Sequence, residues 1–161
     1  MVNLLTGPKG SGKTQQMIEQ ANAKAKECNG NVVFIKKTHR DTASVAFDIR
    51  TICMDDFPTI TNTDEYIGFL YGMYSSNHDI ECIFIDGILK HADISLDSMP
   101  DFIERLKKIS KECGIEFYVS ISADKSDLSG INAEGCTFLN LYNDFNRRGQ
   151  SNRTALYGTK R

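Results

Sequence analysis

Residues near the beginning of the sequence have the types and spacing needed to hold a phosphate group. Gly7, Gly12, Lys13 and Thr14 fit the pattern G-x-x-x-x-G-K-[ST]. In such a loop, successive backbone N–H groups point at phosphate oxygens, and the following helix adds about half a positive charge. The lysine reaches the β- and γ-phosphates, and the threonine hydroxyl is a ligand for Mg²⁺. The pattern predicts a site for ATP and Mg²⁺.

The predicted phosphate-binding residues form one continuous loop: Gly7, Pro8, Lys9, Gly10, Ser11, Gly12, Lys13 and Thr14. Lys13 is also the candidate catalytic residue, because its charge would stabilise a phosphoryl group during transfer. For the whole segment, the alternative is an ordinary glycine-rich turn between a strand and a helix. For Lys9 alone, the alternative is a solvated loop lysine that does not contact phosphate. No N-K-x-D motif for guanine occurs, which favours adenine.

Asp86 is the best candidate for a second Mg²⁺ ligand besides Thr14. It follows the apolar run Cys82–Ile85, so it lies at the carboxyl end of an expected strand, the edge where open α/β sheets bind ligands. The alternative is an aspartate that caps a turn. Gly87 comes next, where many ATPases have a glutamate that activates water. The candidates for a general base are then Asp41, Asp93 and Asp124, each with the alternative of a helix cap or turn residue.

Alternating apolar runs and amphipathic segments predict an α/β fold. Buried strands are expected at residues 2–6, 31–36, 80–85, 115–121 and 136–142, with a short strand at 59–61. Helices are expected at residues 13–28, from 41 to 53, from 63 onward and from 100 to 113. Strands that are apolar on both faces are typical of parallel sheets, so we expect a three-layer α/β/α fold with a mostly parallel central sheet.

Length and composition limit the class of protein further. A chain of 161 residues, 40% of them hydrophobic, is long enough for one domain, which we place at residues 1–143. A net charge of −2 excludes a chain that coats nucleic acid through overall basicity. No apolar run is long enough to cross a bilayer, and we expect no signal peptide. Five cysteines without a C-x-x-C pair indicate reduced thiols and a cytoplasmic protein, with disulfides as the alternative.

Several polar residues leave alternatives open. Residues 144–161 form a basic tail, which either contacts nucleic acid or an acidic partner, or is a solvated terminus. His39 and Arg40 either face the phosphates or form a surface turn. His78 and His91 are isolated, so we expect neither to bind a metal.

The order of these motifs resembles the thymidine kinase family of P-loop proteins. The resemblance covers about residues 1–130 and is carried by Gly7–Thr14 and by Cys82–Asp86, with Val32–Lys36 and Asp124 as less specific parallels. It implies ATP-dependent phosphorylation of a nucleoside, with Mg²⁺ at Thr14 and Asp86. Three features of the family are absent: Gly87 replaces its catalytic glutamate, its zinc-binding cysteine pairs have no counterpart, and its base-enclosing loop is not recognisable after Gly130.

Three functions are therefore consistent with the sequence. The first is a small Mg²⁺-dependent ATPase or ATP-driven switch that acts on a partner. The second is a nucleoside kinase of the thymidine type, and the third is a module that binds nucleotide without catalysis. Gly87 favours the first and third. A homo-oligomer in which a neighbouring subunit supplies the missing base is a further hypothesis.

Overall fold

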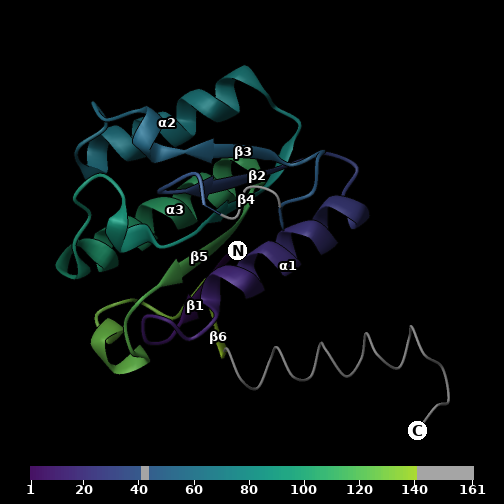
Figure 1. Ribbon diagram of the computed structural model, residues 1–161. Coiled ribbons are helices and arrows are strands. Elements are labelled where there is room, and N and C mark those ends of the chain that lie inside the picture. The colour runs from purple at the N-terminus through teal and green to yellow at the C-terminus, as the bar shows by residue number, and fades with distance from the viewer. Residues whose placement is uncertain (41–43, 141–161) are drawn as a thin grey trace, which may run out of the picture.

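The protein is built on one six-stranded sheet. A computed structural model describes residues 1–40 and 44–140. The strands are β1 (Val2–Thr6), β2 (Asn31–Lys36), β3 (Arg50–Cys53), β4 (Ile80–Ile85), β5 (Glu116–Ile121) and β6 (Cys136–Asn140). All of them are parallel, in the order β3-β2-β4-β5-β1-β6. Parallel strands need crossover connections, and α-helices lie in three of them, from β1 to β2, from β3 to β4 and from β4 to β5 (Figure 1).

Helices cover both faces of the sheet. They are α1 (Lys13–Glu27), α2 (Thr63–Ser76) and α3 (Met99–Cys113). Met17, Ile18 and Ala21 of α1 pack on one face of the sheet, and α2 and α3 pack together on the other. The predicted three-layer α/β/α fold with a parallel sheet is therefore confirmed.

The central strands are hydrophobic on both faces, as this layering requires. Within β4, Ile83 and Ile85 face α2 and α3, whereas Cys82 and Phe84 face α1. The Phe84 ring stacks between Phe34 of β2 and Tyr118 of β5, with ring centroids 6.2 and 4.5 Å apart. Burial of both faces is typical of a parallel sheet, and it fixes the register of the strands that carry the polar loops.

Two elements differ from the sequence-based expectation. Residues 50–53 form β3 rather than the end of a helix, because Thr51 and Ile52 extend the sheet beside β2, while Val45 and Ile49 still pack into the core under α1. The helix predicted from residue 41 to 53 was therefore wrong, although residues 41–43 lie outside the described part of the chain.

The short strand predicted at residues 59–61 was also wrong. The backbone N–H and hydroxyl of Thr61 both donate to the Glu65 carboxylate, at 3.2 and 2.9 Å, and Asn62 caps α2. These residues therefore lead into α2, which begins at Thr63, rather than join the sheet. The strand expected at 136–142 is β6 over its described residues, up to Asn140.

The five cysteines form no disulfide with one another. Each of the five is a free thiol, and Cys53 and Cys82 are buried. Among the described residues, no helix is both long and apolar enough to cross a membrane. The proposed basic tail, residues 144–161, and the boundary at residue 143 lie outside the described residues.

Candidate functional site

The loop Gly7–Thr14 joins β1 to α1 at the carboxyl edge of the sheet. The N–H of Gly7 donates to the Ala123 carbonyl at 3.1 Å, which ties the loop to the segment after β5. Gly12, with a φ of 92°, lies in the left-handed region just before α1 begins at Lys13. A side chain here would strain the backbone, so glycine sets the turn into the helix.

Lys13 is buried and folds back over the loop. Its ammonium donates to the carbonyls of Gly7 and Pro8, at 2.9 and 2.8 Å. Burial lowers the pKa of Lys13 and the nearby Lys90 lowers it further, while the Asp86 carboxylate raises it. A desolvated ammonium whose hydrogen-bond partners are two neutral carbonyls and the Ser11 hydroxyl would gain from an anionic ligand.

Thr14 and Asp86 are in direct contact at the centre of the site. The Thr14 hydroxyl donates to one carboxylate oxygen of Asp86 at 2.9 Å, and the Ser120 hydroxyl donates to the other, also at 2.9 Å. Ser120 in turn accepts the Gly87 backbone N–H at 2.7 Å. Three elements, α1, β4 and β5, therefore hold one carboxylate in a fixed orientation.

Strand order explains why Ser120 is part of this arrangement. β5 lies between β1, which leads into the loop, and β4, which leads into Asp86. A polar residue near the end of β5 therefore reaches across to Asp86. Sequence analysis missed Ser120, although a serine at the carboxyl end of the apolar run Phe117–Ile121 was a usable signal.

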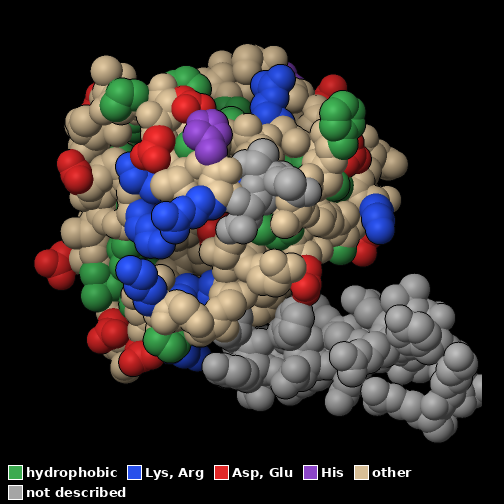
Figure 2. All heavy atoms as spheres, viewed as in Figure 1, with side chains coloured by type: hydrophobic (Ala, Val, Ile, Leu, Met, Phe, Trp, Pro, Cys, Tyr) green, Lys and Arg blue, Asp and Glu red, His purple; other side chains and the backbone are tan. Residues whose placement is uncertain are grey.

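A cavity of about 500 Å³ opens above this carboxylate. Six cationic side chains and, among described residues, one carboxylate line it. The cations are Lys9, Lys13, Lys36, Lys37, Arg40 and Lys90, and the carboxylate is Asp86. Figure 2 shows Lys and Arg side chains gathered on this side of the molecule. Such an excess of positive charge suits a polyanion.

The position after Asp86 carries no acid. Gly87 has a φ of 69°, and the aliphatic stem of Lys90 lies 3.7 Å from where a β-carbon would be. Asp93 and Asp124 do not line the cavity, and Asp124 instead caps the turn Lys125–Leu128. Asp41 lies outside the described residues. The alternative reading of Asp124, as a cap, is therefore the one the structure bears out.

A buried histidine, His91, is hydrogen-bonded to the backbone of Asp86. The Nε2–H of His91 donates to the Asp86 carbonyl at 2.8 Å, which leaves Nδ1 to accept the Tyr66 hydroxyl at 3.1 Å. Burial lowers the pKa of His91 to about 4, although the hydrogen bond to Asp86 raises it. The ring is therefore neutral near pH 7 and links α2 to the end of β4. Sequence analysis regarded His91 only as isolated.

The side chains of His39 and Arg40, which are adjacent in the sequence, lie in different environments. Arg40 lines the cavity, and its carbonyl accepts a hydrogen bond from the Lys36 ammonium. His39 points elsewhere and contacts the Asp56 carboxylate at 2.9 Å. Of the two, only Arg40 is placed to face a ligand in the cavity.

The parallel sheet, the two helical layers and the glycine-rich loop between β1 and α1 define the P-loop NTPase fold. No family model and no curated protein sequence matches the chain. Among solved structures, it is similar to a KaiC-like protein from the hyperthermophilic archaeon Pyrococcus horikoshii OT3, with a TM-score of 0.61 and 21% identity. The alignment covers 86% of this chain and 70% of the archaeal chain. At this identity the likeness establishes the fold.

Proposed function

We propose that this protein is an ATP-binding P-loop protein, either a slow Mg²⁺-dependent ATPase or an ATP-driven switch that acts on a partner. The observation that carries the proposal is the Asp86 carboxylate, fixed between Thr14 and Ser120 at the base of a cationic cavity. The fold shared with a KaiC-like protein supports the same class.

The donor set at the base of the cavity suits magnesium. A hydroxyl oxygen and a carboxylate oxygen are hard ligands, which Mg²⁺ prefers together with phosphate oxygens and water. Thr14 and Asp86 would hold the ion, which would supply charge neutralisation of the phosphates. Their present contact at 2.9 Å means that the two side chains already converge on one point.

Lys13 would bind the β- and γ-phosphates. Its bonds to the carbonyls of Gly7 and Pro8 would be exchanged for charged phosphate oxygens, which accept more strongly. Because its burial disfavours an isolated charge, this exchange is an added source of affinity. Lys90 and Arg40, which line the same cavity, would add further positive charge.

Hydrolysis should be slow, because the described cavity offers no second carboxylate to activate water. Gly87 supplies no side chain, and a lysine stem lies over it. A general base is worth a factor of about 10²–10⁴ in rate. Slow turnover suits a switch, in which bound ATP itself is the signal.

The resemblance to thymidine kinases suggests a second candidate, phosphorylation of a nucleoside. That reaction needs a group to accept the proton of the acceptor hydroxyl, and among described residues the cavity offers Asp86, which would hold the metal. We therefore expect no transfer of phosphate to thymidine or other nucleosides. A phosphorylated nucleoside whose formation depends on Lys13 would establish the kinase instead.

The direct experiment measures thermal unfolding with and without ATP and Mg²⁺. We expect ATP with Mg²⁺ to raise the melting temperature of the wild type, and Lys13→Ala to abolish the shift. Lys26→Ala is the matched control, because Lys26 is an exposed lysine on the same helix, at its far end. Absence of a shift in the wild type would refute the nucleotide site.

Phosphate release then separates a slow ATPase from a module that only binds. Release that is lost in Lys13→Ala indicates hydrolysis, and binding without release indicates a non-catalytic module. If a second copy of the chain supplies the missing base, turnover per subunit will rise with protein concentration. A flat profile would count against that contribution.

A further inference from the structure

Metal-binding side chains converge at a second place, outside the phosphate cavity. His39 follows β2, Cys53 is the last residue of β3, and Asp56 ends the 3₁₀ turn Met54–Asp56. The ligand atoms of the three residues all lie within 4.8 Å of one another. Nothing in the proposed ATP site uses these side chains.

Their convergence follows from the sheet. β2 and β3 are parallel neighbours in which Lys36 pairs with Cys53, so both chains leave the sheet at the same edge. The Lys37 carbonyl accepts both the Asp55 backbone N–H, at 3.0 Å, and the Cys53 thiol, at 3.1 Å. An ion pair of 2.7 Å between the Lys37 ammonium and Asp55 adds a further link. The backbone that carries the three ligands is therefore held in place.

We propose that His39, Cys53 and Asp56 bind a zinc ion. Imidazole nitrogen, thiolate sulfur and carboxylate oxygen are all common zinc ligands, and sites with three protein ligands complete a tetrahedron with water. Tetrahedral zinc, with bonds of about 2.0–2.3 Å, places its ligand atoms roughly 3.3–3.8 Å apart. The separations here are at most 4.8 Å, so the ligand atoms have to approach one another by no more than ~1 Å to reach the upper end of that range.

The side chains allow this adjustment. Those of His39 and Asp56 are 69% and 52% exposed, so both can rotate without repacking the core. Their present contact of 2.9 Å opens slightly as the ion enters between them. Cys53 gives up its thiol proton to solvent, and the resulting thiolate forms the bond to zinc. No electron is transferred.

The ligand atoms of this proposed site favour a different metal from those of the proposed ATP site. Thr14 and Asp86 offer only oxygen, whereas a sulfur and an imidazole nitrogen favour zinc or cobalt over magnesium. The zinc ion would join the end of β3 to the segment after β2. Lys37 and Arg40 of that segment line the phosphate cavity, so the ion would also fix one wall of the ATP site.

The test uses metal alone, without nucleotide, so its result does not depend on the proposed ATPase. Protein stripped with a chelator and kept reduced is titrated with Co²⁺. We expect one equivalent to bind with a thiolate-to-cobalt charge-transfer band, and Zn²⁺ to displace it. Cys53→Ser should remove the band, and His39→Asn and Asp56→Asn should each weaken binding by at least about 10-fold.

The control variants remove the same residue types elsewhere. Cys28→Ser and His78→Asn should retain the band and the affinity. No charge-transfer band in the wild type, or a band that persists in Cys53→Ser, would overturn the proposal. If Cys53→Ser fails to fold, the test depends on His39→Asn and Asp56→Asn, which change exposed side chains. Unchanged affinity for Co²⁺ in both variants would overturn the proposal.

Discussion

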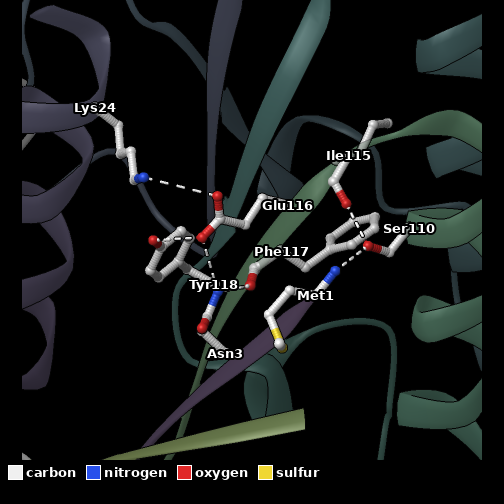
Figure 3. Close-up of polar contacts among 8 residues, drawn as sticks. All are labelled: Met1, Asn3, Lys24, Ser110, Ile115, Glu116, Phe117 and Tyr118. Atoms are coloured by element: carbon white, nitrogen blue, oxygen red, sulfur yellow. Dashed lines mark hydrogen bonds and ion pairs between the residues drawn. The ribbon is translucent and has the colours of Figure 1, made fainter. Parts of the chain in front are cut away.

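The two ends of the parallel sheet both carry polar residues, but these residues are arranged differently. At the amino end, polar groups are satisfied by one another (Figure 3). Asn3 donates to the Glu116 carboxylate and to the Phe117 carbonyl, at 3.2 and 3.1 Å, and Tyr118 donates to the same carboxylate at 2.7 Å. At the carboxyl end, the cavity is lined by six cations and, in the part of the chain that the structure describes, by one carboxylate.

The amino end closes with further internal hydrogen bonds. The amino terminus of Met1 donates to the Ser110 hydroxyl at 2.6 Å, and Ser110 donates to the Ile115 carbonyl at 2.5 Å. Each of the side-chain and terminal donors named here has an acceptor within the protein. These hydrogen bonds join β1, β5 and α3 to one another. We therefore expect them to contribute to the free energy of unfolding.

At the carboxyl end, the described residues that line the cavity include more cations than carboxylates, although Lys37 is also paired with Asp55. Lys13 donates to neutral carbonyls, and its burial lowers its pKa. An excess of positive charge in a cavity is a cost in the folded state without ligand, which ATP would remove. The difference teaches that substitutions at the amino end should alter stability alone, and those at the carboxyl end should alter binding first.

The largest effect is expected from Asp86→Asn. Loss of the carboxylate should weaken ATP binding in the presence of Mg²⁺ by about 100-fold or more, since even indirect metal partners are worth 10–100-fold. In EDTA the variant should bind ATP as well as the wild type or better, because a negative charge near the phosphates is gone. Calorimetric titration under both conditions measures this.

Asp79→Asn is the control for that comparison. Asp79 is exposed and precedes the same strand, β4, at its amino end. It should leave ATP affinity unchanged with or without Mg²⁺. Equal Mg²⁺ dependence in Asp86→Asn and the wild type would show that the metal assignment is wrong.

The next effect concerns His91, whose pKa is lowered by burial to about 4. The unfolded chain binds a proton near pH 6.5 and the folded protein does not, so stability is full above that value and falls as the pH drops to about 4. The loss is about 3 kcal/mol for a shift of this size. Urea unfolding between pH 7 and pH 4 measures it.

His91→Gln isolates this contribution from that of other titrating groups. Glutamine can still donate to the Asp86 carbonyl but does not titrate. The stability advantage of the wild type over His91→Gln should therefore shrink as the pH falls. His78→Gln, at an exposed histidine, should follow the wild type, and a parallel decline in all three proteins would contradict the role of His91.

At the amino end, Asn3→Ala should lower stability by about 1–3 kcal/mol, because it leaves the buried Phe117 carbonyl without its side-chain donor. The loss of the bond to Glu116 contributes to the same change. ATP affinity should stay within twofold of the wild type, since Asn3 lies at the opposite end of β1 from the phosphate loop. A large loss of affinity would mean that the two ends are coupled.

The fold and the centre of the site were accessible from the sequence because each depends on local patterns. Apolar runs fixed β1, β2, β4 and β5, and the loop spacing placed Lys13 and Thr14 at the start of α1. The contact of Thr14 with Asp86 follows from two strands that end at one edge. The roles of these residues in binding ATP and Mg²⁺ stay predictions.

What sequence analysis missed depends on packing between distant segments. Residues 50–53 have an amphipathic pattern that fits a helix, and only pairing with β2 makes them β3. Ser120 reaches Asp86 because β5 lies between β1 and β4, which no local pattern specifies. His39 meets Cys53 and Asp56 for the same reason, across two adjacent strands.

The smallest effects come from one lysine at each end. Lys24→Ala removes a partly exposed ion pair of 3.7 Å with Glu116, and Lys9→Ala removes an exposed lysine of the phosphate loop. Neither should change stability by more than about 0.5 kcal/mol, because solvent screens exposed charges. Only Lys9→Ala should weaken ATP binding, by a few-fold at low salt and less at high salt. Equal affinity in both variants would mean that Lys9 is a solvated loop lysine, and that the positive charge needed for binding lies deeper in the cavity.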